Sequence, residues 1–263
     1  MTKYKHLHID CTRGISGDMI LASLVDLGVH PDNLISGLSG FGWTVSSENF
    51  LREERDGTSG LNIYFEAPVA SHSRDDDYHD HHPNQPGNHS HRSFREIEAM
   101  IRKSSLTGSI KDTAVAIYEV IGEAEAKVHE TDLDHVHFHE VGRDTAIMNI
   151  IGVAICLEVL QIGRVTCSDL HDGTGFIECS HGRIPVPVPA VRAMLEGTSY
   201  RLVQEDVETE MVTPSGLGIL KGIKALPVAA VPGKILTTGI GFGKKDTGRP
   251  QGVRAYLLDK SVK

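Results

Sequence analysis

Three histidines alternate along the segment from His135 to His139, and a glutamate follows them directly. In an extended strand, alternate side chains lie on one face, about 6–7 Å apart. Imidazoles at this spacing could converge on one transition-metal ion or on two neighbouring ions, because neutral imidazole suits nickel and zinc. The sequence therefore predicts metal ligands at His135, His137 and His139, with Glu140 as a ligand, an orienting group or a catalytic base. The alternative is a solvated strand whose histidines are incidental.

Residues 70–92 contain a second group of histidines, together with two prolines and almost no aliphatic side chains. This composition predicts a flexible loop. Imidazoles interleaved with aspartates could hold several exchangeable ions loosely, since ordering a flexible chain opposes binding. The candidate metal-collecting residues are His79, His81, His82, His89 and His91. The alternative is a solvated linker of biased composition.

Two turns could present backbone amides to an anion such as phosphate. The first follows a strand and opens a helix; its candidate binding residues are Gly14, Ser16 and Gly17. Asp10 and Asp18 bracket this turn and could instead hold a cation. Thr213 begins the second turn. Ordinary helix capping explains both turns equally well.

The run from Gly239 to Lys245 ends in two lysines and precedes Arg254, so cations near a flexible backbone could clamp a phosphate or a carboxylate. Neither GKS nor GKT occurs there, which excludes a nucleotide P-loop. Ordinary surface lysines remain the alternative.

Hydrophobic periodicity predicts the elements that position these residues. Strands are expected over 5–10, 43–52, 61–66, 135–139, 163–165, 235–240 and 253–258, with a turn at Asp56-Gly57. Helices are expected over 19–27, 32–38, 94–101, 110–128, 145–160, 190–196 and 215–223. Because strands and helices mix without regular alternation, the predicted class is α+β, with mixed sheets and packed helices in one large domain or two intimate subdomains. The predicted parts are a strand-turn-helix region over 1–69, the histidine-rich loop over 70–92, and the remainder over 93–263.

Composition narrows the partners and the compartment. The net charge is −9 and the basic residues are scattered, which argues against nucleic acid. No stretch is long and apolar enough for a membrane span, and no signal peptide is apparent, so a cytoplasmic location is expected. Four cysteines without CxxC pairing predict no disulfide framework.

Five motifs together resemble the LarC family of nickel-insertion proteins. They are DCTRGISGDMILASLVDLG at 10–28, HVHFHEVG at 135–142, IPVPVPAV at 184–191, VTPSG at 212–216 and GIGFGKKD at 239–246. The resemblance covers nearly the whole chain. It implies a chelatase that inserts nickel into a pyridinium mononucleotide carrying two thiocarboxylates, which yields the nickel-pincer cofactor of lactate racemase. It also implies CTP with magnesium or manganese, and motif residues at Asp10, Ser16, Asp18, His137, His139 and Glu140.

Two departures from the family pattern are visible. Thr145 and Asn149 stand where members usually have two aspartates four residues apart on a helix, so one helix face lacks two carboxylates. The additional C-terminal domain of full members, associated with CTP binding, has no counterpart, which implies either a separately made CTP-binding subunit as a partner or a diverged activity. A homo-oligomer is left open.

Three other functions compete with nickel insertion. A nickel storage or delivery protein would bind several ions through residues 72–91 without affinity for the mononucleotide. A zinc-dependent hydrolase would use the three histidines of 135–139 with activated water and Glu140 as base. A structural or interaction module would leave the histidine pattern unexplained.

Overall fold

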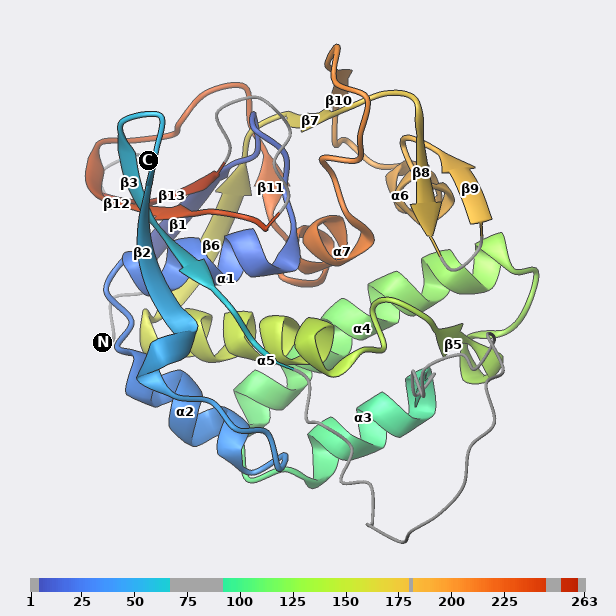
Figure 1. The fold of residues 1–263 in the computed structure, drawn as a ribbon, viewed down its shortest axis with the longest axis horizontal. Helices are drawn as coiled ribbons and strands as arrows, with labels where there is room; N and C mark the ends of the chain where they lie inside the picture. The colour runs from blue at the N-terminus through green and yellow to red at the C-terminus, as the bar shows by residue number, and fades with distance from the viewer. Residues whose placement is uncertain (1–4, 67–91, 180–181, 245–251, 260–263) are drawn as a thin grey trace, which may run out of the picture.

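A mixed seven-stranded sheet forms one side of the molecule in the computed structural model, which describes residues 5–66, 92–179, 182–244 and 252–259 (Figure 1). Its strand order is β11-β6-β1-β13-β12-β3-β2. The strands are β1 (Lys5–Asp10), β2 (Phe50–Arg55), β3 (Thr58–Ile63), β6 (Ile162–Cys167), β11 (Leu226–Pro227), β12 (Ile235–Gly241) and β13 (Val253–Leu258). Strand β1 runs parallel to β6 and antiparallel to the central strand β13, so the first and last strands of the described residues pair inside the sheet.

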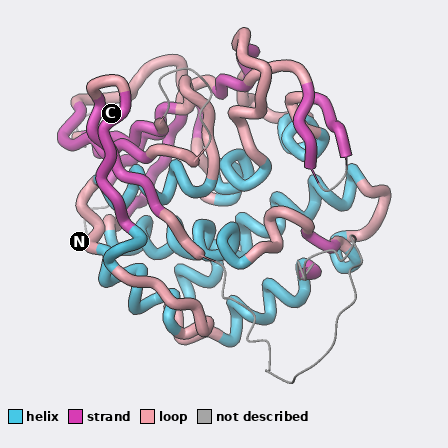
Figure 2. The backbone as a smooth tube through the Cα atoms, in the orientation of Figure 1, coloured by secondary structure: helices cyan, strands magenta, loops and turns pink. Residues whose placement is uncertain are grey.

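Helices cover one side of this sheet in successive layers (Figures 1 and 2). They are α1 (Gly17–Asp26), α2 (Pro31–Ser39), α3 (Phe94–Lys103), α4 (Gly108–Val128), α5 (Asp144–Val159), α6 (Pro189–Leu195) and α7 (Pro214–Gly222). Helix α1 packs on β12, β3 and β13, and α5 packs on α1. Helix α4 contacts α5, α6 and α7, while α2 packs on α5 and α3 on α4.

Short elements surround the helices. Strand β4 (Arg92–Ser93) pairs with β5 (His137–Phe138), β7 (Leu170–Asp172) with β10 (Leu202–Gln204), and β8 (Phe176–Cys179) with β9 (Gly182–Pro185). Two 3-10 helices, η1 (Ser47–Asn49) and η2 (Leu133–His135), complete the set found in the described ranges.

The contact between α1 and β12 depends on two glycines. A Cβ atom added at Gly239 would lie 2.2 Å from the Ser23 carbonyl oxygen, and one at Gly241 would lie 2.1 Å from the Met19 carbonyl oxygen. Only glycine therefore lets the helix backbone approach the strand this closely. Residues 239–241 form the end of the strand predicted over 235–240, beneath α1, and the clamp role of the run stays a prediction.

Most fold predictions are confirmed. The class is α+β with a mixed sheet, and all seven predicted helices are present within a few residues of their expected bounds. Asp56 and Gly57, with φ of 49° and 68°, form the predicted turn between β2 and β3. The strand expected over 43–52 begins only at Phe50, because a capping box at Ser46 and Asn49 closes a 3-10 turn first.

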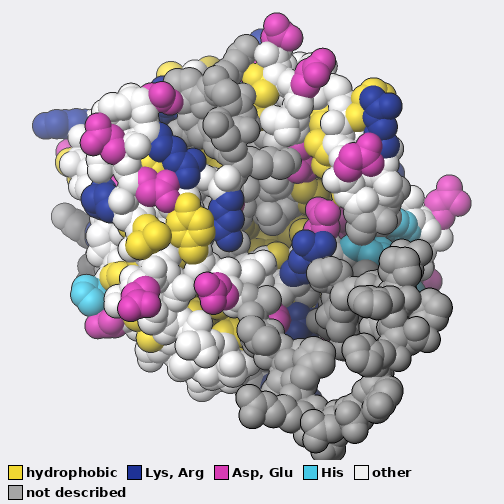
Figure 3. Space-filling model, viewed as in Figure 1, with side chains coloured by type: hydrophobic (Ala, Val, Ile, Leu, Met, Phe, Trp, Pro, Cys, Tyr) yellow, Lys and Arg dark blue, Asp and Glu magenta, His cyan; other side chains and the backbone are white. Residues whose placement is uncertain are grey.

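Other predictions fall outside what the structure tests. Residues 70–91 of the predicted loop lie outside the described residues, while Arg92 belongs to β4. The proposed division at 69 and 92 stays a prediction. Within the described ranges, no helix combines the length and the apolar character that a membrane crossing requires. On the face shown in Figure 3, acidic and basic side chains are interspersed.

Candidate functional site

Two glycine turns lie against each other and bring two helix starts together. The Ile15 amide donates to the Met211 carbonyl at 2.7 Å, and the Thr213 amide donates to the Ile15 carbonyl at 3.0 Å. A Cβ at Gly14 would lie 2.6 Å from the Met211 oxygen, and one at Gly216 would lie 2.5 Å from the Ile15 oxygen. The glycines thus permit a backbone-to-backbone approach that places the N-terminus of α1 beside that of α7.

Helix α5 packs against the junction of α1 and α7. A Cβ at Gly17 would lie 3.4 Å from Ser215 Oγ and 3.5 Å from Asn149 Cβ, so the first turns of α1 and α7 lie against the second turn of α5. Helix N-termini carry partial positive charge and unpaired amides, which favours an anion at this junction.

Two cavities adjoin at these helix starts and share five lining residues. The first encloses about 410 Å³ and the second about 460 Å³. Both are lined by Glu140, Ile177, Cys179, Glu210 and Thr213. Because these residues belong to both, the cavities form one continuous depression with two chemically different ends.

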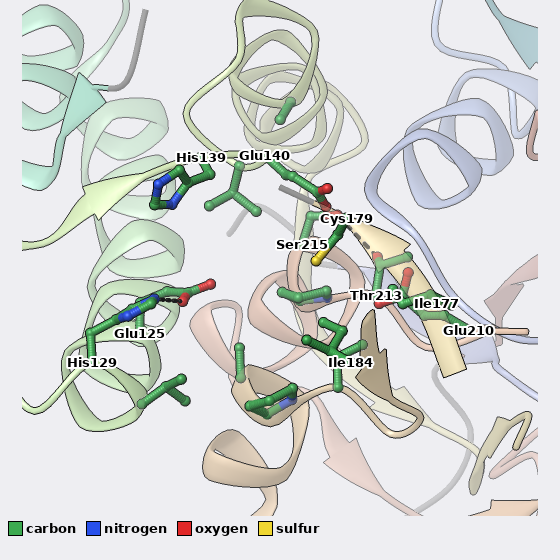
Figure 4. A pocket seen from close by; sticks show the side chains of 17 residues that line it. Glu125, His129, His139, Glu140, Ile177, Cys179, Ile184, Glu210, Thr213 and Ser215 are labelled. Atoms are coloured by element: carbon green, nitrogen blue, oxygen red, sulfur yellow. Dashed lines mark hydrogen bonds and ion pairs between the residues drawn. The ribbon is translucent and has the colours of Figure 1, made fainter. Parts of the chain in front are cut away.

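The first end, here called the histidine cavity, contains Glu125, His129 and His139 (Figure 4). Glu125 and His129 lie at the C-terminal end of α4, and His139 follows β5. The His129 Nε2 atom is 3.6 Å from Glu125 Oε2, and the ring centroids of His129 and His139 are 6.4 Å apart. Apolar side chains complete the wall: Val128, Val141, Ala146, Ile184, Val188, Pro189 and Ala190.

Burial dominates the acid–base behaviour of this end. It raises the pKa of Glu125; nearby His129 opposes the shift, and the charge of Glu140 adds to it. The Glu140 carboxylate is therefore close enough to Glu125 to act on it electrostatically, although the two acids come from different elements.

The second end, here called the arginine cavity, carries Arg13, Arg143 and Lys244. None of these cations forms an ion pair with a carboxylate of the described residues. Burial lowers the pKa of Arg13, and the neighbouring guanidinium of Arg254 lowers it further. Ser16, Asp18 and Thr145 line the same cavity. Unpaired cations at clustered helix starts suit a phosphate group.

Hydrogen bonds and an ion pair stabilise the turn that carries His139 and Glu140. Tyr118, fully buried in α4, donates a hydrogen bond to the Val141 carbonyl at 3.0 Å. Arg92 donates to the Gly142 carbonyl at 3.0 Å and pairs with Asp144 at 2.7 Å. These contacts fix the backbone of the turn between β5 and α5, and so the direction in which the Glu140 side chain projects from it.

The predicted three-histidine strand is wrong in its geometry. Val136 and Phe138 are buried as predicted, but His135 ends the 3-10 helix η2 and the strand comprises only His137 and Phe138. His137 is exposed, and His139 is the one histidine of the three that lines the depression. Across the described parts of the chain, no three His, Cys, Asp or Glu side chains are grouped closely enough to hold a metal ion. Metal roles for His135 and His137 stay predictions, and His79, His81, His82, His89 and His91 lie outside the described residues.

The other predicted residues divide into two groups. Ser16, Asp18, Thr213 and Glu140 line the depression. Ser16 occupies the N-cap of α1, but its hydroxyl bonds Asp18 instead of a backbone amide. Asp10 and Arg254 lie opposite each other on β1 and β13 and line neither cavity.

Sequence reasoning missed several lining residues. Glu125 and His129 are four residues apart at the end of a predicted helix, a spacing that places both on one face and could have revealed them. Cys179, Glu210 and Arg13 carry no such signal. Of the two departures from the family pattern, Thr145 lines the arginine cavity, whereas Asn149 lines neither cavity and its buried Oδ1 has no hydrogen-bond partner among the described residues.

Comparison with known proteins identifies the family. The model described as "Nickel insertion protein" matches residues 7–263. The chain is 39% identical over 254 residues to the pyridinium-3,5-bisthiocarboxylic acid mononucleotide nickel insertion protein of Acetivibrio thermocellus, covering 95% of this chain and 60% of that protein. It is 40% identical over 267 residues to the protein of the same name in Lactiplantibacillus plantarum, covering 97% and 61%. A putative nickel insertion protein of Roseiflexus castenholzii is 33% identical over 96% of this chain and 59% of its own length.

The chain therefore spans about 60% of the length of these curated relatives. No solved structure matches it. A family match over almost all residues, and relatives aligned across nearly the full chain, establish that this chain belongs to the nickel insertion protein family.

Proposed function

We propose that this chain inserts nickel into a pyridinium-3,5-bisthiocarboxylic acid mononucleotide and so forms the nickel-pincer cofactor of lactate racemase. The observation that supports this most strongly is the charge layout of the depression. The two imidazoles lie at one end, whereas the three cations lie at the other, where Asp18 and Glu178 also line the cavity. A mononucleotide has the matching layout, with a phosphate at one end and metal-binding thiocarboxylates at the other.

This layout orients the substrate. The phosphate lies in the arginine cavity against Arg13, Arg143 and Lys244, near the starts of α1 and α7. The ring lies between Ile177 and Ile184, where an apolar wall suits a flat aromatic group. The thiocarboxylates then face His139, and the carboxylates of Glu140 and Glu210 flank the positively charged ring at the junction of the cavities.

The chemical step balances without a redox change. Divalent nickel gains two bonds to the thiocarboxylate sulfurs and one to a ring carbon. That carbon loses its proton and keeps the electron pair that forms the bond. Glu140, which reaches both cavities, accepts this proton in the proposal.

CTP and a magnesium or manganese ion belong to the proposal as well. The chain matches about 60% of the relatives' length, and in the proposal a CTP-binding part, on the same polypeptide or on another, completes the system. The depression described here then supplies the nickel and mononucleotide sites.

The test uses the tag-free full chain with the precursor, nickel, CTP and magnesium, and with cell extract to supply a partner. Formation of the nickel-pincer product is followed by its absorbance and by activation of lactate racemase. The Arg13→Ala variant is expected to weaken precursor binding about 10-fold, because one charge-assisted contact contributes about 1.5–3 kcal/mol.

Arg201→Ala is the matched control, since Arg201 is an exposed arginine paired with Asp169 outside both cavities. Nickel binding without any affinity for the precursor would instead identify a storage or delivery protein. Turnover of a phosphoester with one tightly bound zinc ion would identify a hydrolase.

A further inference from the structure

The histidine cavity places two imidazoles from distant parts of the chain opposite each other. His129 caps the end of α4, and His139 follows β5. Their ring centroids are 6.4 Å apart, with planes inclined by 45°. Both line the cavity whose far end joins the proposed phosphate site. Figure 4 shows the two rings one above the other, with Glu125 beside His129 and the Glu140 carboxylate directed away from both rings, toward Cys179 and Ser215.

We propose that nickel is held before insertion by His129 and His139, and not by the three histidines of 135–139. The proposal rests on nickel being the cargo of this chain, as set out under the proposed function. It assigns a ligand, His129, that the sequence motifs do not contain.

The separation of the rings suits one shared ion. With metal–nitrogen bonds of about 2.0–2.1 Å, two imidazoles on adjacent positions of one ion have centroids about 4.5–5.5 Å apart. The pair is therefore about 1–2 Å wider than a closed site, a gap that side-chain rotation closes. His137 is exposed outside both cavities, so it would require movement of the strand itself to join.

Glu125 supports His129 as a ligand. Its carboxylate lies 3.6 Å from His129 Nε2. This separation is longer than a hydrogen bond, so the carboxylate attracts the ring electrostatically; a small side-chain rotation brings it into hydrogen-bond range, where it holds the proton on Nε2 and leaves the Nδ1 lone pair for a metal ion. The Glu125 carboxylate also places negative charge beside the His129 ring, which attracts a divalent cation.

Two protein ligands are also what a transferred ion requires. The product holds nickel through two sulfurs and one carbon, which are three of the four positions of a square-planar ion. A cage of three or four side chains would have to be dismantled before the precursor could bind. Two imidazoles leave two positions open for the incoming sulfurs, and this agrees with the absence of any larger ligand group in the described parts of the chain.

The test distinguishes nickel binding at His129 and His139 from nickel binding by the histidine-rich segment. In a full-length background the six histidines of 72–91 are replaced by serine, so that one class of fixed site remains to be measured. Nickel binding is then measured by calorimetry, and X-ray absorption at the nickel edge counts the imidazole ligands. One ion with two imidazoles is expected.

His129→Ala and His139→Ala are each expected to weaken nickel binding about 10-fold or more and to reduce the count to one imidazole, as the loss of one ligand should. His30→Asn is the matched control, because His30 is exposed on α2 and asparagine keeps its capping contact to the Asp32 amide. Thermal unfolding shows whether each variant is folded. The imidazole count is measured on the background chain itself, so it does not depend on whether the His129 and His139 variants fold.

Either of two results would overturn the proposal. One is a nickel ion bound by three imidazoles in the background chain. The other is a loss of nickel affinity in His135→Ala and His137→Ala as large as that in His139→Ala, with no loss in His129→Ala. The two proposals fail separately. If nickel insertion proceeds normally without His129, only the two-histidine nickel site is refuted. If the chain binds nickel through two imidazoles but never binds the precursor, only the proposed function is refuted.

Discussion

Glu140 occupies the point where the two cavities meet, next to a proposed nickel ligand and between the two ends of the depression. Its backbone belongs to the turn that Tyr118 and Arg92 brace. A carboxylate held in this way can reach a ring carbon that lies between phosphate and metal. This is the geometry that a base for ring deprotonation requires.

Replacing Glu140 by glutamine should therefore lower the single-turnover rate of nickel insertion by about 100-fold or more, the usual contribution of a positioned acid or base. Precursor binding should change little, because glutamine keeps the size and polarity of the side chain. Glu54→Gln, at an exposed position on β2, serves as the control. A Glu140→Gln chain that inserts nickel at the full rate would remove the base assignment.

The pKa of Glu125 makes a prediction about stability. Burial raises this pKa above its ordinary value of 4.5, so the folded chain holds a proton on Glu125 more tightly than the unfolded chain does. Between the two pKa values the folded state binds more protons, and its stability falls as pH rises through that window. Glu125→Gln removes this penalty and should be more stable than the parent at pH 7, with a smaller difference at pH 4.

Urea unfolding at both pH values, in the presence of a chelator, measures this difference. The opposite order, with the variant relatively weaker at pH 7, would mean that attraction to His129 outweighs burial of the carboxylate.

Among the elements, the close contact between α1 and β12 sets the position of the arginine cavity. Helix α1 begins at the turn that carries Arg13 and Ser16, and Gly241 of β12 lies directly under its first turn. A shift of α1 would move these residues relative to α7. The strand glycines thus act on the site without lining it.

Gly241→Ala should destabilise the fold by about 1–3 kcal/mol, as overpacking in a close contact does. The added carbon would lie 2.1 Å from the Met19 carbonyl oxygen and 2.4 Å from the Ser23 amide nitrogen, both of them backbone atoms that cannot rotate away. Gly108→Ala, at the open start of α4, should be neutral or stabilising by up to about 1 kcal/mol. Chemical denaturation compares the two, and equal stability would show that α1 does not sit this close to β12.

At the scale of the whole molecule, the positions of the charged residues matter more for phosphate binding than the net charge does. The chain carries a net charge of −9, yet Arg13, Arg143 and Lys244 line one cavity without forming ion pairs to carboxylates of the described residues. A phosphate can therefore find an attractive end of the depression on a protein that repels anions overall. The attraction between such partly exposed charges is screened by salt.

Binding of the mononucleotide should accordingly weaken by about 10-fold between about 0.05 and 0.5 M NaCl. Nickel binding to the imidazole pair should change much less, because bonds to neutral imidazole do not depend on attraction between full charges. Calorimetry at several salt concentrations measures both. Mononucleotide affinity that is independent of salt would place the phosphate away from these cations.

Local patterns in the sequence predicted most of the elements. Helical periodicity located all seven helices, and alternation located the long strands, because each pattern reflects which side of an element is buried. The five motifs identified the family for the same reason, since each is a contiguous run. The turns at Gly14 and Thr213 and the role of Glu140 in the depression also followed from neighbouring residues.

Only the tertiary structure could place residues from distant elements together. His129 lies near His139 because α4 ends opposite the turn after β5, and Arg13 and Arg143 line one cavity because the turns that precede α1 and α5 both border it. The strand predicted over 135–139 is too long for a related reason: a 3-10 turn ends at His135, so Val136 and Phe138 are buried as predicted but only His139 of the three histidines lines the depression. Sequence spacing determines which residues share an element, whereas packing between elements decides which residues share a site.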